Sequence, residues 1–353
     1  MSISNRKADH IQLCIDGDVG FHQKSTLFED IDVIHNALPE LSLDEIDLSS
    51  DFAGKKLRYP LIIAAMTGGV EKATKINRDL AEVAEKLGIG FAFGSQRPLL
   101  THGIADGYTV RDVAPNCLLL GNLGVVQAKE AKVDEIEKMI QISAVDALCI
   151  HLNPAMEVVQ PEGDRDFSGG LQCIEHLHKN LSIPIVVKET GCGISKSVAE
   201  RLKNIGIQWI DVSGAGGTSW VAVEAHRAQD SQKSLGQRFW DWGIPTAASV
   251  GQLQGLDLGI CATGGIQNGL MIGKALAMGA KCGGIARNVL QVYDASGKDG
   301  VEQYLNQVID EIRVFALLCG ARNIADLQKI PLILGEKIQK WLPHNSPLFH
   351  RRW

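Results

Sequence analysis

The sequence predicts an α/β protein: a (β/α)8 barrel preceded by an N-terminal arm and followed by a C-terminal helical extension. Three observations support this prediction. Eight short apolar runs occur within the 353 residues, stretches with helical periodicity separate them, and glycine or polar residues follow every run. Such residues gather at the functional end of barrels of this type. A doubly wound parallel sheet with a cap domain shows the same alternation and remains an alternative.

The predicted strands are the apolar runs, which are too short for buried helices. They are Leu61–Met66, Ile89–Phe93, Cys117–Gly121, Ala147–Leu152, Ile183–Lys188, Trp209–Ser213, Leu258–Thr263 and Cys282–Ala286. Helices are predicted where apolar residues recur every three to four positions between the runs. These stretches include Ala73–Leu87, Ala128–Ile142, Ser195–Ile205 and Gly269–Met278.

Three parts of the chain are distinguished by composition. Residues 1–58 are polar with scattered apolar positions, which indicates a mobile arm or lid, and residues 59–290 contain all eight predicted strands. Residues 291–353 are expected to be helical to about Cys319 and then to form a proline-containing tail. We expect this tail to pack on the outside of the barrel or on a neighbouring subunit.

Composition excludes several classes of protein. The net charge of -6 gives no general attraction to nucleic acid or to an anionic membrane, so any bound phosphate must be held locally. The eight cysteines form no C-x-x-C pair and lie mostly in apolar runs, which predicts reduced core thiols. Neither a signal peptide nor an apolar run of about 18 residues is present, so a cytoplasmic protein is expected.

Glycine-rich loops follow three of the predicted strands. They occur at residues 213–219 (SGAGGTS), at 263–265 (TGG) and around CGGIAR at 282–287. Glycine allows positive φ and lets backbone N–H groups approach an anion, and the next helix adds its positive end. Barrels often bind phosphate after strands seven and eight, so Gly264, Gly265, Ala286 and Arg287 are candidates for a cofactor-phosphate site. One such glycine pair could be a tight turn, but repetition favours phosphate binding.

Charged residues at other strand ends suggest further roles. Lys188 ends the fifth run, where its ammonium could stabilise negative charge at N1 of a reduced flavin or could simply reach solvent. After the fourth run, Glu157 is a candidate oxygen ligand for Mg²⁺, while His151 could be either a catalyst or a hydrogen-bonding residue. A cationic clamp for a diphosphate could combine Arg6, Lys7, His10 and Arg97.

These motifs together resemble those of the type 2 isopentenyl diphosphate isomerases, flavin-dependent enzymes of the FMN-linked barrel superfamily. The resemblance covers nearly the whole chain. It runs from RKADH at 6–10 through MTGG, GSQR, GNLG, HLNP, QPEGDRDF, VVKETGCG, SGAGGTSW, DWGIPTA and TGGIQNG to GGIAR. It implies a homo-tetramer or homo-octamer that interconverts isopentenyl and dimethylallyl diphosphate by a 1,3-proton shift. The implied cofactors are reduced FMN and Mg²⁺, with NADPH as the reductant.

The resemblance also implies roles for individual residues. FMN would contact Met66, Thr67, Gly68, Ser95, Asn122, Lys188, Ser213, Thr218, Gly264, Gly265, Ala286 and Arg287. The substrate would meet Arg6, Lys7, His10, Ser95, Gln96 and Arg97. Catalysis would involve His151, Asn153, Lys188 and position 156, and Glu157 would bind Mg²⁺.

Two positions depart from the family pattern. Met156 stands where most members carry a glutamine that is a favoured partner in proton transfer, and a thioether cannot relay a proton at neutral pH. Either the flavin performs both proton transfers, or His151, Glu157 or a bound water assists, or this protein has another function. Gln267 and Met271 replace an Arg and an Asp of the family, which predicts the loss of an ion pair near the flavin phosphate.

Two rival functions remain. An FMN-dependent 2-hydroxyacid oxidase would use a similar barrel, but it would place a histidine base after strand six, where this chain has Ser213-Gly214-Ala215-Gly216. The other rival is a flavin-binding sensor without catalysis, which the methionine at position 156 suggests.

Overall fold

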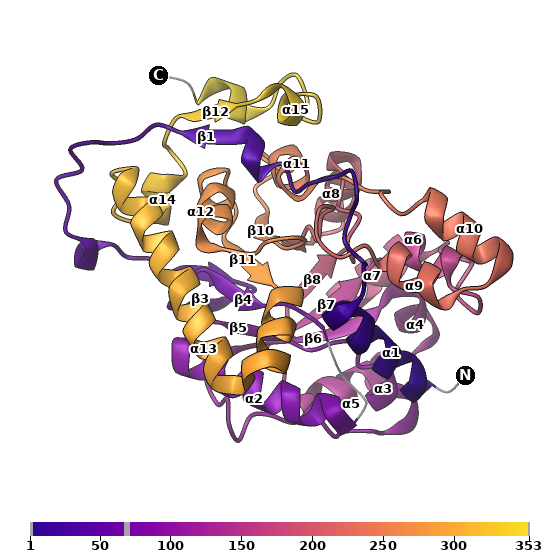
Figure 1. Ribbon diagram of the computed structural model, residues 1–353. Helices are drawn as coiled ribbons and strands as arrows, with labels where there is room; N and C mark the ends of the chain where they lie inside the picture. Colours follow the sequence, from indigo (N-terminus) through magenta and orange to yellow (C-terminus); the bar gives the residue numbers. More distant parts are fainter. Residues whose placement is uncertain (1–2, 67–70, 352–353) are drawn as a thin grey trace.

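The predicted barrel is confirmed, because eight parallel strands close into one sheet (Figure 1). The computed structural model describes residues 3–66 and 71–351, with the backbone alone for 3–8 and 71–72. The strand order is β10-β11-β4-β5-β6-β7-β8-β9, and closure of this ring excludes the doubly wound alternative. The strands are β4 (Leu61–Ile63), β5 (Gly90–Ala92), β6 (Leu118–Gly124), β7 (Ala147–His151), β8 (Ile185–Lys188), β9 (Trp209–Asp211), β10 (Gly259–Ala262) and β11 (Cys282–Ile285).

Helices surround the barrel between these strands. They are α2 (Glu71–Leu87), α3 (Arg97–His102), α4 (Val125–Glu130), α5 (Val133–Ser143), α6 (Pro154–Val159), α7 (Gly170–Asn180), α8 (Lys196–Asn204), α9 (Trp220–Arg227), α10 (Asp230–Arg238), α11 (Thr246–Gln252) and α12 (Gly269–Ala277). The single helix predicted over residues 128–142 is wrong. Extended backbone at Lys132, with φ −77° and ψ 152°, separates α4 from α5.

A hairpin closes the amino-terminal end of the barrel, which the sequence did not predict. Strands β2 (Ser50–Phe52) and β3 (Lys55–Leu57) pair antiparallel below the barrel. Phe52 and Leu57 pack in one buried cluster with side chains from seven of the eight barrel strands. Lys55 Nζ donates to the carbonyl oxygen of Cys117 at 3.1 Å, just before β6 begins. The hairpin therefore covers the end of the barrel opposite the strands' carboxyl ends.

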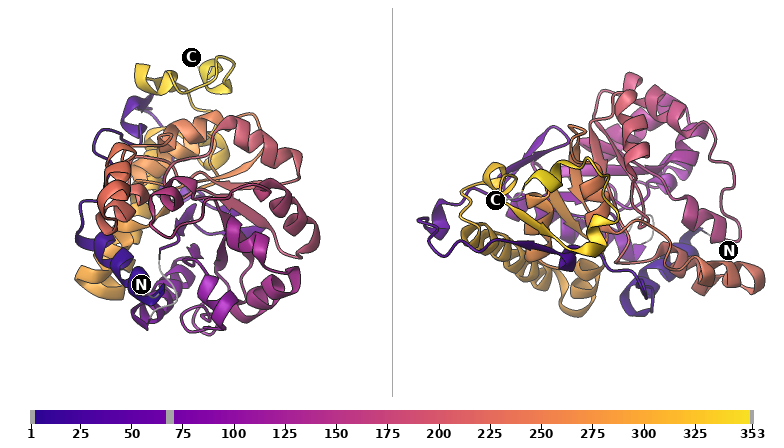
Figure 2. Two further views of the ribbon diagram at one scale, coloured as in Figure 1. Left: turned by 90° about the vertical axis from the view of Figure 1, so that its right-hand side faces the viewer. Right: turned by 90° about the horizontal axis from the view of Figure 1, so that it is seen from above.

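The two ends of the chain meet outside the barrel. Strand β1 (Ile31–Val33) pairs antiparallel with β12 (Leu332–Leu334), and this small sheet lies at one edge of the molecule (Figures 1 and 2). The tail begins after α13 (Arg287–Leu318), a helix interrupted at Gly297, and includes α14 (Ile324–Leu327) and α15 (Glu336–Gln339). Arg351 attaches the tail to the barrel by donating to the carbonyl oxygen of Ala277 at the end of α12, and it also donates to those of Leu327 and Ile330 within the tail.

The arm (residues 3–58) is therefore folded against the barrel. Short 3-10 turns at Phe28–Asp30 and Leu43–Glu45 connect its helix, α1 (Ile3–Asp16), to β1 and to the hairpin. Phe28 and Ile31 are fully buried. All eight cysteines are free thiols, as predicted. Among the described residues, no helix has the length and apolarity needed to span a membrane.

Phe52 should contribute strongly to stability. We expect Phe52→Ala to lower the free energy of unfolding by about 3–5 kcal/mol, because a fully buried aromatic side chain is lost and leaves a cavity. Urea denaturation followed by circular dichroism would measure the change. The matched control, Leu38→Ala, removes a side chain that is 75% exposed and should leave the midpoint nearly unchanged. Equal midpoints for the two variants would show that the hairpin is not part of the core.

Candidate active site

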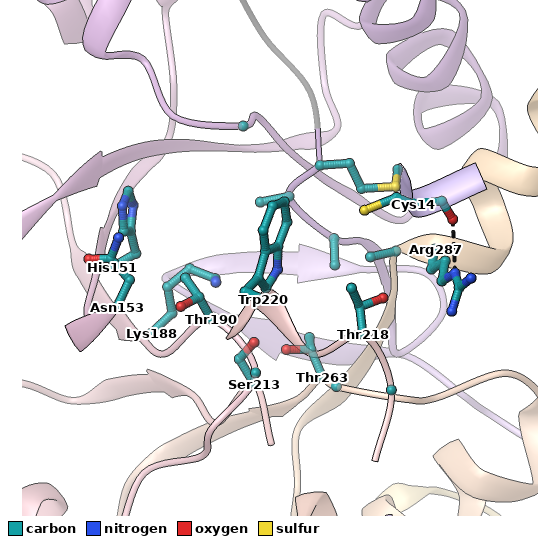
Figure 3. Close-up of a pocket in the computed structure, with 18 of the residues that line it drawn as sticks. Cys14, His151, Asn153, Lys188, Thr190, Ser213, Thr218, Trp220, Thr263 and Arg287 are labelled. Atoms are coloured by element: carbon teal, nitrogen blue, oxygen red, sulfur yellow. Dashed lines mark hydrogen bonds between the residues drawn. The ribbon is translucent and has the colours of Figure 1, made fainter. Parts of the chain in front are cut away.

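A cavity of about 580 Å³ opens at the carboxyl ends of the barrel strands, where enzymes of this architecture place their active sites (Figure 3). Most of the residues predicted to form a site line it. They are His10, Met66, Ser95, Arg97, Asn122, His151, Asn153, Met156, Glu157, Lys188, Ser213, Thr218, Gly264, Gly265, Ala286 and Arg287.

Five predicted residues are not placed in the cavity wall. Thr67 and Gly68 lie outside the described residues, and the side chains of Arg6 and Lys7 in α1 are not described. Gln96 is described and points elsewhere, because its Oε1 accepts a hydrogen bond of 3.0 Å from the backbone N–H of Asn122. Its side chain is fully buried beneath β6. Gln96 therefore supports the site and is not positioned to touch a substrate.

The glycine-rich loops form one side of the cavity. Gly264 and Gly265 have φ of 99° and 73°, conformations that favour glycine. A side-chain carbon at Gly264 would lie 2.1 Å from the carbonyl oxygen of Gly214, so the loops after β9 and β10 are in direct contact. Next to them, α13 begins at Arg287, and the N–H groups of its first turn lack helical partners. This arrangement suits a phosphate group.

Buried charge lies at the base of the cavity. Lys188 is 7% exposed and donates to the carbonyl oxygen of Glu189 at 2.5 Å. Asp211, on the neighbouring strand, accepts hydrogen bonds from the hydroxyl of Thr263 and from the N–H of Ser213. Burial raises the pKa of Asp211, although the nearby Lys188 opposes that shift. Asp211 and Thr263 were not predicted as site residues, although a carboxylate within the apolar run IDVSG could have indicated a buried site.

Polar side chains after β7 form the opposite wall. His151, the last residue of β7, and Asn153 both line the cavity (Figure 3). Asn153 Nδ2 donates to Glu157 Oε1 at 2.7 Å, and the N–H of Asp164 donates to Glu157 Oε2 at 3.0 Å. Both Glu157 oxygens are thereby oriented at the cavity edge. The backbone N–H of Asp164, a residue to which the sequence pattern assigned no role, holds the metal-ligand candidate in place.

The arm passes over the cavity. His10, Ile11 and Cys14 of α1 line the cavity wall. Arg287 donates from Nε to the carbonyl oxygen of Cys14 (Figure 3) and from Nη2 to that of Gly17, each at 2.8 Å. Its guanidinium therefore binds the carboxyl end of α1, where the helix dipole favours a cation. We had expected this side chain to contact a phosphate.

His10 connects the arm to α9. Its Nε2 lies 2.8 Å from Oε1 of Glu224, a carboxylate with no exposed surface that also accepts from Arg227 at 2.7 Å. The His10 ring also contacts the edge of Trp220, with ring centroids 5.3 Å apart. Glu224 and Trp220 were not predicted as site residues, because the sequence of α9 alone resembles that of any amphipathic helix. These contacts place His10 at the cavity and fix the arm above it.

Comparison with known proteins assigns the family. The model of the FMN-dependent dehydrogenase family matches residues 137–333. An isopentenyl-diphosphate delta-isomerase from Pyrococcus horikoshii is 44% identical over 348 residues, covering 96% of this chain and 94% of that protein. The chain belongs to the type 2 isopentenyl-diphosphate delta-isomerase family. The isopentenyl-diphosphate delta-isomerase from Methanosarcina mazei is 43% identical, with 96% of this chain and 94% of that protein covered.

Solved structures agree on the fold. A mandelate oxidase mutant with a monooxide FMN adduct has a TM-score of 0.63 and 18% identity, covering 90% of this chain and 94% of that chain. A mandelate oxidase mutant with (S)-mandelic acid also has a TM-score of 0.63, at 17% identity, covering 95% and 99%. At such identities the likeness shows the shared barrel alone.

Arg287 should keep the arm closed over the cavity. We expect Arg287→Ala to accelerate amide hydrogen exchange in residues 9–20, because two charge-assisted hydrogen bonds are lost and each contributes about 1.5–3 kcal/mol. Mass spectrometry would measure the exchange rates. Lys298→Ala is the control, because it removes a surface ion pair from the same helix. Unchanged exchange in the Arg287 variant would mean that other contacts hold the arm.

Proposed function

We propose that this protein interconverts isopentenyl and dimethylallyl diphosphate, using reduced FMN and Mg²⁺. The observation that carries the proposal is the composition of the cavity walls. A glycine cradle, a buried lysine and an oriented carboxylate face one enclosed space. Its volume is within the usual range of small-molecule sites. Family membership supports the same activity.

The residues fit a flavin mononucleotide. Gly264 and Gly265 would hold its phosphate, together with the first turn of α13, and Lys188 would place a cation near the ring. When bound, reduced FMN supplies an electron-rich ring with a nitrogen that exchanges protons. The loop at residues 213–219 carries no histidine, so the base that a 2-hydroxyacid oxidase needs is not supplied there. This observation disfavours the oxidase as a second function.

The residues also fit Mg²⁺. Glu157 presents a carboxylate at the cavity edge, and the described part of the chain contains no group of three or more His, Cys, Asp or Glu side chains that could hold a metal. Mg²⁺ is commonly bound through one or two carboxylates, with substrate phosphates and water completing its octahedral shell. One protein carboxylate is therefore sufficient for a diphosphate-bound Mg²⁺.

The chain's own residues would orient the substrate and exclude water. Arg97, together with Arg6 and Lys7, would bind the diphosphate, while His10 and Trp220 would enclose its hydrocarbon end beneath the arm. Protonating an alkene generates a carbocation-like centre, which water would capture in an open site. Closure of the arm by Arg287 and Glu224 would keep water out.

Met156 is a residue of the cavity wall that the proposed mechanism does not use for proton transfer. Its sulfur lies 4.0 Å from Asn153 Nδ2, within the cavity wall, and cannot relay a proton. We propose that the essential proton transfers do not involve residue 156 and that Met156 shapes the pocket. We further propose NADPH as the reductant, a homo-tetramer or homo-octamer as the assembly, and the cytoplasm as the location.

A direct assay tests the function. The purified protein with FMN, Mg²⁺, NADPH and isopentenyl diphosphate under anaerobic conditions should produce dimethylallyl diphosphate, observed by NMR of the alkene protons. Omitting the reductant should abolish turnover, because the oxidised ring is not electron-rich. A protein that binds FMN but leaves the alkene unchanged would instead be a sensor.

Position 156 can be tested with two substitutions. Met156→Leu keeps the size and apolarity, so kcat should stay within about threefold of the unmodified protein. Met156→Gln introduces the usual family residue and should likewise alter kcat by less than about tenfold, or about 1.4 kcal/mol. An inactive unmodified protein, with activity recovered in Met156→Gln, would defeat the proposal that residue 156 is dispensable.

A further inference from the structure

A buried hydrogen bond fixes the protonation of His151. Asn122 Nδ2 donates to the carbonyl oxygen of Phe93 at 3.0 Å. Because a carbonyl oxygen can only accept, this contact determines which end of the Asn122 amide is the nitrogen. Asn122 Oδ1 therefore faces His151 Nδ1 at 2.8 Å, and Nδ1 must carry the proton that it donates.

His151 stays neutral in this position. Burial, with a smaller contribution from the charge of Lys188, lowers the pKa of His151 to about 3. A neutral imidazole that carries its proton on Nδ1 has a lone pair on Nε2. His151 thus presents a hydrogen-bond acceptor and no positive charge.

A second acceptor lies beside this nitrogen. Gln127 Nε2 donates to a carboxylate oxygen of Asp164 at 2.9 Å, which identifies the other end of the amide as Oε1, a hydrogen-bond acceptor. A side-chain carbon at Gly124 would lie 2.2 Å from this oxygen and 3.0 Å from His151 Nε2. Both acceptors therefore lie close to the same point beside Gly124, a residue without a side chain, and both of their side chains line the cavity.

We propose that Asn122 is a positioning residue that holds His151 as its Nδ1–H tautomer, and that His151 Nε2 binds a hydrogen-bond donor, namely a water molecule. The identity of the neighbouring ligand rests on the proposed function. An unprotonated diphosphate oxygen would face the lone pairs of Nε2 and of Gln127 Oε1, and this contact is repulsive. A water molecule can donate to both acceptors and offer its oxygen to Mg²⁺ or to a diphosphate-bound proton. His151 would then contact the diphosphate through water.

Nitrogen-15 NMR of the histidine-labelled protein with FMN bound tests the tautomer. The His151 signal is identified by its loss in His151→Gln. We expect a protonated Nδ1 and an unprotonated Nε2 at neutral pH. A proton on Nε2, in either the other tautomer or the imidazolium form, would overturn the assignment. Adding Mg²⁺ and inorganic diphosphate should leave Nε2 unprotonated, whereas protonation of Nε2 on binding would indicate direct contact with phosphate.

Two matched variants separate positioning from structure. Asn122→Leu removes the acceptor for Nδ1–H, so His151 should lose its single tautomer and kcat/KM should fall at least tenfold. Asn77→Leu removes another buried amide, which donates to the carbonyl oxygen of Gly107 outside the cavity wall, and should leave the His151 spectrum unchanged. If Asn122→Leu does not fold, the nitrogen-15 spectrum of the unmodified protein still shows which nitrogen of His151 carries the proton. If the spectrum shows the expected tautomer but the protein does not turn over isopentenyl diphosphate, the proposed isomerase function is refuted and the positioning role of Asn122 stands.

Discussion

Strand register in the closed barrel is the constraint on which the site depends. One row of paired Cα positions runs across neighbouring strands, from Gly124 to His151, Lys188, Asp211 and Cys261. Residues separated by about 140 positions in the chain thus become neighbours at one level of the barrel. A shift of one residue in any strand would turn its side chain to the opposite face of the sheet. The hairpin β2–β3 supports this register by filling the opposite end with Phe52 and Leu57.

Burying so many polar groups requires partners for each of them. Lys188 donates to a backbone carbonyl, Asp211 accepts from Thr263 and Ser213, and His151 donates to Asn122. These bonds offset the cost of removing the groups from water and fix their directions. The result is a cavity in which Lys188 supplies positive charge, Glu157 supplies negative charge and His151 supplies a neutral acceptor. This division of charge is compatible with the proposed binding of a diphosphate, Mg²⁺ and a flavin.

The arm connects the cavity to distant parts of the chain. Arg287, at the start of α13, binds the end of α1, and Glu224 of α9 binds His10. The loop that would hold a flavin phosphate is therefore adjacent to the residue that holds the arm closed. If the cofactor phosphate binds there as proposed, cofactor binding and closure of the arm would both depend on the amino-terminal end of α13.

The sequence by itself determined the barrel and the family, and most of the residues that it predicted for the site line the cavity. Periodicity identified the strands, and glycine or polar residues at strand ends identified which residues would meet, because parallel strands in a barrel share one carboxyl end. It did not determine the hairpin below the barrel, the support given by Gln96 and Asp164, the pairing of Glu224 with His10, or the attachment of Arg287 to α1. Each of these depends on contacts between segments far apart in the chain, such as the 273 positions between Cys14 and Arg287. Local sequence patterns indicate which face of a helix or strand is buried and where that element ends. The packing of the whole chain decides which partner a buried polar group has.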